Sequence, residues 1–523
     1  MSRKAIKVVA LAWLGGLLAL AGRPASAQTI IATDTTWTAA DSPVVLVEDA
    51  TILEGVTLTI EPGVTVQLAS FVSIHVAGQL VAQGTEGSPV LFTGDATGTE
   101  PARWGSVVFL DSSVDAEFAD VDDYVSGSLV EHCIFEHATR AIQMRGASPY
   151  IHWSTFRDNR YTGGGGDTMG GAALFIVEGS APRVAGCAFT NNSAVGAEGG
   201  AIRIDTSSPI IQDNVFTGNT SMYGGALAAY WSLSPIVGNT FEGNEGGFEG
   251  GAISLYASQN AFLNNRVVGN QSLFDGGGVH VCVDCFPHAN PLMIDNTITD
   301  NVALLEGGGG VGAKYIRVLS HNNIHDNVTD GDPNDFSFFN ILAEGYPDWI
   351  QYPNATNNWW GTTDPAVVAE AIHDGVDEEG YGIVSFEPLL SGPVEAPDTR
   401  VTITSLKIRY EVEDDPMPVL LTLYNPGPER EVRLLVLWQL EGTPPAYYRG
   451  GLDFPGASDQ DDGYRLLLPE NSVFFTELIA PGFAPVPGVR DGFWHAALID
   501  VASGERIGDV CTIGVRLGVG GGA

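Results

Sequence analysis

The side chains best suited to chemistry recur at nearly one interval along the chain: Glu178, Asp205, Tyr230 and Tyr256. Each stands nine residues before a Cys or Asn that belongs to a longer repeat. Tyrosine combines an apolar ring face with a polar edge, which suits a sugar ring. Two carboxylates one repeat apart suit acid–base chemistry at a glycosidic bond, or binding of Ca²⁺. The repeat therefore predicts one outward-facing ridge, with Arg203 and His280 beside it.

Three interpretations of this ridge stay open on the sequence alone. The ridge can be an ordinary solvated strand face, because tyrosine also has a high strand propensity. It can be a ligand-binding surface formed by Tyr230, Tyr256, Arg203 and Asp205. It can also be a catalytic site, for which the candidates are Glu178, Asp205 and Arg203.

Two further groups could hold a metal ion. Glu198, Glu249 and Asp275 each precede a Gly-Gly pair, and Glu249 and Asp275 are equivalent positions of neighbouring repeats that could share a cation such as Ca²⁺. Charged turns are the alternative. A compact cluster offers ligands that zinc accepts, or a Cys282–Cys285 disulfide, or free thiols; it consists of His280, Cys282, Cys285 and His288. The pattern requires no cofactor, and Ca²⁺ is kept as an optional ligand.

The elements that position these groups follow from an internal repeat. A Pro-x-Val/Ile segment leads to Asn or Cys, then to Phe two residues later and to Asn three residues further on. From Phe189 the steps to Phe216, Phe241 and Val267 are 27, 25 and 26 residues. A Gly-Gly-Ala-Ile segment follows each copy, as at Gly199 and Gly250. Short alternating apolar segments between turn residues predict strands without helical periodicity.

Stacked coils place equivalent residues in columns about 4.8 Å apart. We expect an interior aromatic column of Phe156, Phe189, Phe216 and Phe241. We also expect an amide ladder, in which each amide satisfies the next, along Asn214, Asn239, Asn265, Asn296 and Asn322. Cys133 and Cys187 share a column with Ser154 between them. Two coil spacings, about 9.6 Å, exceed the reach of a disulfide, so this pair should not form.

The chain resembles the bacterial right-handed parallel β-helix proteins of the pectin-lyase architecture over residues 30–390. The resemblance rests on the segment from Gly55 to Val66, on Trp104-Gly105, and on the closing Asn357-Asn358-Trp359-Trp360-Gly361. It implies the fold but not an activity, since such proteins include lyases, hydrolases, binding modules and adhesins. From the repeat we predict about eleven or twelve coils with almost no helix after the signal peptide. The paired-Asp and Gly-His-Gly motifs of polygalacturonases are missing from the sequence, as is a convincing pectate-lyase signature.

The ends and the composition complete the expected organisation. Residues 1–27 look like a signal peptide, because Arg3, Lys4 and Lys7 precede an apolar run and an Ala-Ser-Ala site. Residues 28–392 form the β-helix, 393–398 a linker, 399–517 a small β-sandwich and 518–523 a C-terminal tail. The formal net charge of −39 disfavours nucleic acid and anionic lipid as partners. No other apolar run is long enough for a transmembrane segment.

We therefore expect an all-β monomer, exported to the cell surface or the medium, that binds polysaccharide or another cell-envelope partner without catalysis. A polysaccharide lyase or glycoside hydrolase with an unrecognised site is the first alternative. A structural or adhesive rod, in which the C-terminal unit makes the contacts, is the second.

Overall fold

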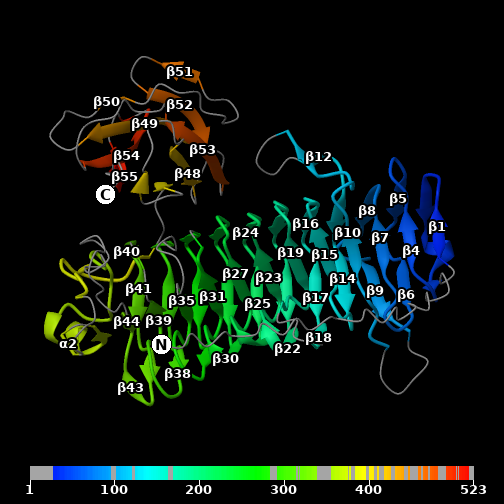
Figure 1. The fold of residues 1–523 in the computed structure, drawn as a ribbon, viewed down its shortest axis with the longest axis horizontal. Coiled ribbons are helices and arrows are strands. Elements are labelled where there is room, and N and C mark those ends of the chain that lie inside the picture. The colour runs from blue at the N-terminus through cyan, green and yellow to red at the C-terminus, as the bar shows by residue number, and fades with distance from the viewer. Residues whose placement is uncertain are drawn as a thin grey trace, which may run out of the picture.

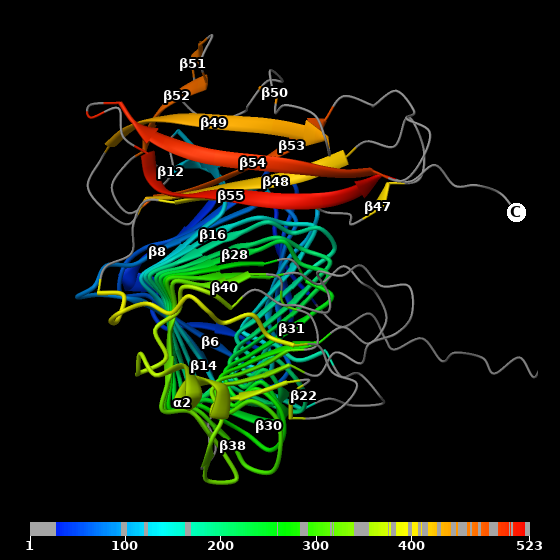
Figure 2. The same cartoon turned by 90° about the vertical axis from the view of Figure 1, so that its left-hand side faces the viewer.

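The computed structural model describes residues 28–338, except 96–101, 120–123, 163–168, 259, 283–290, 314, 315 and 317. It also describes residues 355–395, except 375 and 378–382, and the strands given below between residues 400 and 517. In these parts the chain winds into a long parallel β-helix (Figures 1 and 2), and only two short helical segments occur. They are the 3₁₀ helix η1 (Ala39–Asp41) and α2 (Pro365–Glu370).

Sheet A carries the predicted ridge and has 13 strands, β1-β4-β7-β10-β15-β19-β23-β27-β31-β35-β39-β44-β45 in spatial order. Their bounds are Thr29–Ile31, Ala50–Ile52, Ile74–Val76, Val107–Phe109, Ile142–Arg145, Leu174–Val177, Ile202–Asp205, Leu227–Tyr230, Ile253–Tyr256, Val279–Cys282, Val311–Ala313, Phe336–Phe338 and Ile372–His373.

Sheet B follows sheet A in each coil and has 11 strands, β2-β5-β8-β13-β16-β20-β24-β28-β32-β36-β40. They span Thr35–Trp37, Thr57–Ile60, Gln79–Gln83, Leu129–Glu131, Tyr150–His152, Arg183–Ala185, Ile210–Gln212, Pro235–Val237, Ala261–Leu263, Leu292–Ile294 and Val318–Ser320.

Sheet C also has 11 strands, β3-β6-β9-β14-β17-β21-β25-β29-β33-β37-β41. They span Val44–Leu46, Thr65–Leu68, Val90–Gly94, Cys133–Glu136, Thr155–Arg157, Ala188–Thr190, Val215–Thr217, Thr240–Glu242, Arg266–Val268, Thr297–Thr299 and Asn323–His325. The 11 strands of sheets B and C agree with the expected eleven or twelve coils.

Sheet D closes the later coils with β18-β22-β26-β30-β34-β38-β42-β43. These strands are Arg160–Thr162, Ser193–Glu198, Thr220–Tyr223, Glu245–Glu249, Gln271–Ser272, Val302–Ala303, Val328–Thr329 and Asp332–Pro333. A hairpin of β11 (Glu117–Phe118) and β12 (Tyr124–Ser126) stands out from the coils (Figure 1).

The C-terminal strands form two further sheets, drawn in yellow to red in Figure 1. One has the order β46-β48-β53, with bounds Arg400–Ser405, Met417–Asn425 and Ser472–Ala480. The other has the order β47-β55-β54-β49-β52-β51, with bounds Arg409–Tyr410, Arg506–Leu517, Arg490–Asp500, Arg430–Leu440, Gly463–Leu468 and Ser458–Gln460; β50 (Ala446–Tyr447) pairs with β49. That these sheets form a β-sandwich, and the proposed domain boundaries, stay predictions.

The interior columns that the repeat predicted are present. The phenylalanine column is fully buried and its rings stack, with Phe189 and Phe216 centroids 4.7 Å apart and Phe216 and Phe241 centroids 4.6 Å apart. It extends toward the N-terminus through Phe135 to Phe92. The stacked rings belong to the continuous hydrophobic core of the rod.

The predicted amide ladder is also present and continues to Asn358. At each step the Nδ2 group donates to the Oδ1 atom of the next Asn, as from Asn214 to Asn239 at 3.0 Å. The final step runs from Asn322 to Asn358, also at 3.0 Å. A second ladder runs beside sheet D through Asn159, Asn192, Asn219, Asn244, Asn270, Asn301 and Asn327. It ends on the carboxylate of Asp335, 2.9 Å from Asn327 Nδ2.

Glycine pairs make the corner between sheets D and A. A Cβ atom at Gly200 would lie 2.1 Å from the carbonyl oxygen of Gly225 in the next coil. The main chains of successive coils therefore touch at this corner, and only glycine leaves room for the contact. This corner brings the end of each sheet D strand against the outer face of sheet A.

Candidate functional site

Arg203 lies at the centre of the candidate site and is buried. Ile202 and Ile204 of β23 point into the core, so Arg203 and Asp205 point outward from the same strand. The guanidinium pairs with Glu198, at the end of β22 across the glycine corner, and its Nη2 atom lies 2.9 Å from Asp205 Oδ2. Only 4% of Arg203 is exposed. Arg203 is therefore largely shielded from solvent, and its contact with a ligand stays a prediction.

Tyr230 covers Arg203 and is stacked between two groups. The Arg203 guanidinium carbon lies 3.6 Å from the Tyr230 ring centroid, and the Tyr256 ring lies 4.9 Å away on β31 at an interplanar angle of 25°. Asp205, Tyr230 and Tyr256 are register partners, as the repeat predicted. Because both neighbours stack on Tyr230, that ring has no free face for a sugar.

The hydroxyl of Tyr230 stays protonated at ordinary pH. Burial raises its pKa, and the negative charge of Glu198 raises it further, although Arg203 acts in the opposite direction. A phenol that keeps its proton donates a hydrogen bond and does not serve as a base. Tyr230 therefore contributes a polar edge to the site.

Trp231 is the residue of this site that the sequence interpretation missed. It follows Tyr230 at the corner after β27, has a left-handed backbone (φ 46°) and is 49% exposed. Its ring lies 6.0 Å from Tyr256 at an angle of 83°. The repeat was used to compare strand positions only, so Trp231, which lies at a corner, was not considered. The adjacent Tyr230-Trp231 pair was the available signal.

Glu178 does not lie in this column, and its predicted position is corrected. The register pairs Val177 of β19 with Arg145 of β15, while Ile176 pairs with Ile204, so Val177 occupies the position equivalent to Asp205. Glu178 follows the strand in a left-handed conformation (φ 63°) and pairs with Arg145 at 2.8 Å. Glu178 and Asp205 are therefore not equivalent carboxylates of adjacent coils, and the paired-carboxylate interpretation loses its basis.

The second acidic set belongs to the same outer face. Glu249 Oε2 lies 3.3 Å from His280 Nδ1, and Asp275 Oδ2 lies 3.7 Å from His280 Nε2. His280 is 1% exposed and sits on β35, in register with Ser254 of β31. Among the described residues, no group of three or more His, Cys, Asp or Glu is arranged to hold a metal ion. The His280 imidazole lies between these two carboxylates, and a cation shared by Glu249 and Asp275 stays a prediction.

The remaining metal candidates are only partly described. Cys282 is in register with Tyr256, and nothing further is described for its side chain. Cys285 and His288 lie outside the described residues. The zinc and disulfide interpretations of this cluster therefore stay predictions.

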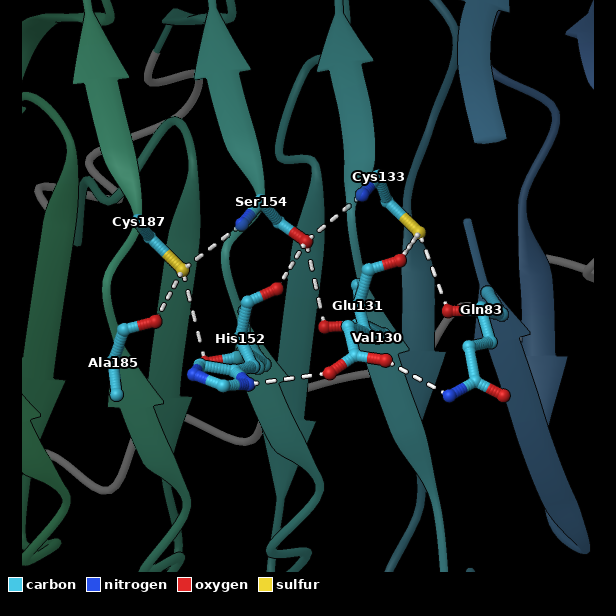
Figure 3. Close-up of polar contacts among 10 residues, drawn as sticks. Gln83, Val130, Glu131, Cys133, His152, Ser154, Ala185 and Cys187 are labelled. Atoms are coloured by element: carbon cyan, nitrogen blue, oxygen red, sulfur yellow. Dashed lines mark hydrogen bonds and ion pairs between the residues drawn. The ribbon is translucent and has the colours of Figure 1, made fainter. Parts of the chain in front are cut away.

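The two interior cysteines do not pair, as predicted. Figure 3 shows Ser154 between them, with its Oγ atom accepting from Cys133 N at 3.1 Å and its main-chain N donating to Cys187 Sγ at 3.5 Å. Both cysteines are free and buried. Burial raises the pKa of the Cys187 thiol to about 12 and raises that of Cys133 as well. Neither thiol is suited to act as a nucleophile.

A second polar row lies on the outer face of sheet B. In Figure 3, Gln83 Nε2 donates to Glu131 Oε2 at 2.9 Å, and Glu131 Oε1 lies 3.3 Å from His152 Nδ1. Trp153 stacks on His152 with centroids 3.8 Å apart and is 54% exposed. Trp153 thus matches Trp231 in exposure and in its left-handed corner position, but it lies at another corner of the coil.

Comparisons with known proteins agree with this architecture. The family model described as "Right handed beta helix region" matches residues 111–267 and 169–329, and the "Pectate-lyase like beta helix domain" model matches residues 29–120. A search of curated proteins gives no match. No helix among the described residues is long and apolar enough to span a membrane.

One solved structure is similar: the enzymatically active domain of tailspike protein 4 from bacteriophage CBA120. The identity is 10% and the TM-score 0.28, and the match covers 90% of this chain and 64% of that chain. A similarity at this level assigns no activity. The sheets and the two family models cover a continuous segment from residue 29 to residue 329, and this chain accordingly belongs to the right-handed parallel β-helix proteins.

Proposed function

We propose that the chain is an exported, non-catalytic protein that binds a polysaccharide along the outer face of sheet A. The observation that carries the proposal is the site formed by Tyr230, Trp231 and Tyr256, in which a half-exposed indole stands beside two stacked phenols. Sugar rings present C–H groups to an indole face and hydroxyls to polar edges. Trp231 would supply the face, and the tyrosine hydroxyls the edges.

Arg203 would act on this surface as a positioning residue. Its ion pairs with Glu198 and Asp205 fix the guanidinium, and the guanidinium in turn supports the ring of Tyr230. A surface whose side chains are held before the ligand arrives loses less conformational entropy on binding. The role of Arg203 is therefore to keep the tyrosine edges in place.

The second candidate function is a polysaccharide lyase or glycoside hydrolase that uses the same face. His280 between Glu249 and Asp275 favours it, because an imidazole held by carboxylates can carry a proton. The carboxylates of Glu198 and Asp205 are both held in ion pairs by the Arg203 guanidinium. A structural rod with no glycan ligand is the third interpretation.

The test measures the binding of the chain that begins at residue 28 to a panel of neutral and acidic polysaccharides. We expect Trp231→Ala to weaken binding about tenfold, the loss typical of an aromatic contact residue. Trp153→Ala is the matched control, since it removes an equally exposed corner tryptophan, and it should bind as the wild type does. Equal affinities of Trp231→Ala and wild type would remove this face from consideration.

Two further arms separate the alternatives. Assays for reducing ends and unsaturated products on the same panel detect turnover, and loss of turnover in His280→Gln would assign the enzyme interpretation. Binding measured with Ca²⁺ and with a chelator tests the optional cation. Absence of binding to every polysaccharide, with a folded chain, would leave the rod interpretation.

A further inference from the structure

One outward column of sheet B changes from polar to apolar along the rod. It begins with Gln83, Glu131 and His152, passes through Ala185 and Gln212, and continues in later coils with Val237, Leu263 and Ile294. These later residues point away from the core, because the alternating residues Ile236, Phe262 and Met293 point into it. The apolar patch is defined as Val237, Ala261, Leu263, Leu292 and Ile294.

The apolar patch is covered in the structure. Val237 and Leu263 are each 1% exposed, and Ile294 is 9% exposed. Val237, Ala261, Leu263 and Ile294 form a hydrophobic cluster separate from the core of the rod. Strands that are apolar on both faces are typical of sheets covered on both sides. The outward face of sheet C in the same coils includes exposed Glu242 and Arg266, as expected of a solvated face.

The same sheet shows how such a face is covered nearer the N-terminus. There the β11–β12 hairpin lies over sheet B, and its Phe118 packs on Tyr150 with ring centroids 5.0 Å apart. Leu129, Tyr150 and Ala185 form a buried cluster with residues of this hairpin. The outer face of sheet B is thus apolar where another segment of this chain covers it.

The chain itself fixes which segment can reach the apolar patch. Val394 is held on the last coil, where its N donates to Asn323 Oδ1 at 2.7 Å and its O accepts from Asn323 Nδ2 at 3.0 Å. Strand β46 begins at Arg400, so six residue steps span at most about 20 Å. The strands of the patch, β28, β32 and β36, lie one to three coils from β40, or about 5 to 15 Å.

We propose that the apolar patch is the docking surface for the C-terminal strands, with β46, β48 and β53 as its occupant. The tether keeps the start of β46 within about 20 Å of Val394, so the C-terminal strands can reach the patch. Strands β48 and β53 are rich in apolar residues in sequence, as in Pro418 to Leu421 and Val473 to Phe475. Figure 2 draws the C-terminal strands on the sheet B side of the rod, and Figure 1 draws them next to the later coils. The occupant is therefore a part of the same chain and not a second copy.

The test uses the chain that begins at residue 28 and introduces a charge into its apolar patch. Val237→Glu places a carboxylate at a 1% exposed position, whereas Val215→Glu makes the same change at a 46% exposed outward position of sheet C. A buried unpaired charge is strongly unfavourable, so the docked state of Val237→Glu should be disfavoured. Cleavage by a glutamate-specific protease at the exposed Glu395 should rise at least about tenfold, while Val215→Glu should be cleaved at the wild-type rate.

Small-angle X-ray scattering of the wild type decides the case even if Val237→Glu fails to fold. We expect a monomer whose scattering fits one compact arrangement, and a larger radius of gyration for folded Val237→Glu. A monomer whose C-terminal unit samples many positions in the wild type would overturn the proposal. A wild-type dimer that dissociates in Val237→Glu would also overturn it, because the patch would then be covered by a second copy.

Discussion

Burial decides the role of individual side chains on the outer face of sheet A. Arg203, Tyr230 and Trp231 are all of a type that binds ligands, yet they differ in what they can reach. Arg203 is 4% exposed and supports its neighbour, Tyr230 is covered on both ring faces, and Trp231 is 49% exposed. Of these three side chains, Trp231 is therefore the one that a ligand can reach most readily.

Replacing Arg203 should destabilise the fold more than replacing a comparable surface arginine. Arg203→Ala leaves Glu198 and Asp205, whose side chains are 15% and 20% exposed, without their cation. We expect the free energy of unfolding to fall by about 2 kcal/mol or more. Arg145→Ala breaks one ion pair of a side chain that is 40% exposed. It should lower the free energy of unfolding by less than about 1 kcal/mol. Guanidinium titration of both variants measures the difference, and equal losses would contradict this role.

Asp335 should make stability depend on pH. Burial raises the pKa of this carboxyl to about 6, while hydrogen bonds from Asn327 act in the opposite direction. Because the pKa of Asp335 is higher in the folded state, its protonation stabilises the fold. This contribution is fully present below pH 3.8, the ordinary pKa, and is lost as pH rises through about 6. The loss at pH 7 is about 3 kcal/mol, since one pKa unit is about 1.4 kcal/mol.

Asp335→Asn keeps an oxygen that can accept from Asn327 and removes the buried charge. We expect it to stabilise the protein above pH 6 and to leave it nearly unchanged at pH 4. Asp332 is an exposed residue of the same coil, and Asp332→Asn should leave the stability unchanged both at pH 4 and above pH 6. Thermal unfolding from pH 4 to pH 8 provides the comparison, and a variant less stable than wild type at pH 8 would refute the assignment.

At the scale of the elements, the amide ladders connect the coils. Asn244 Oδ1 accepts from Asn219 N and Nδ2 at 2.9 Å each, and its own Nδ2 donates to Phe216 O and Asn270 Oδ1. Asn244→Ala leaves several buried groups unsatisfied and should cost about 3 kcal/mol or more. Gln271→Ala removes an exposed amide one coil away and should cost less than about 0.5 kcal/mol. Chemical denaturation tests both; similar losses would mean that water replaces the ladder contact.

The corners offer an equally sharp comparison between two glycines. Gly186 and Gly243 have left-handed backbones with φ of 63° and 62°. A Cβ atom at Gly186 would lie 2.5 Å from Cδ1 of Trp153, whereas one at Gly243 would meet nothing within 4 Å. Both Ala substitutions should cost about 1 kcal/mol for the backbone. Gly186→Ala should in addition displace Trp153 and shift the tryptophan emission; an unchanged spectrum would contradict this packing.

The sequence predicted the strands, the phenylalanine column and the first ladder, because each coil repeats the same strand and turn units. It misplaced Glu178 because the turn after β19 contains one residue more than the turn after β23, and a fixed spacing of nine residues cannot detect that. It did not anticipate the burial of Arg203, since Glu198 reaches it across a corner from another sheet. Trp231 was missed because corner residues vary freely between coils.

At the scale of the whole molecule, the charge of −39 acts against the compact state through self-repulsion. Salt screens charges over about 10 Å at 0.1 M, so the thermal midpoint should rise as NaCl increases from about 0.01 M to about 0.5 M. Scanning calorimetry measures this trend. A midpoint that falls with salt would show that ion pairs, such as those of Arg203, outweigh the net repulsion.

The ladders also give the rod a direction, and this bears on how such a gene can change. Each amide-to-amide hydrogen bond runs from Nδ2 of one coil to Oδ1 of the next higher-numbered coil, so the last coil supplies the final acceptors, Asp335 and Asn358. A whole coil duplicated or deleted between Asn192 and Asn301 would meet the same donors and acceptors on both sides. Repeat arrays of this kind are stabilised mainly by contacts between neighbours. Evolution can thus adjust the length of the molecule in steps of one coil while both ends stay as they are.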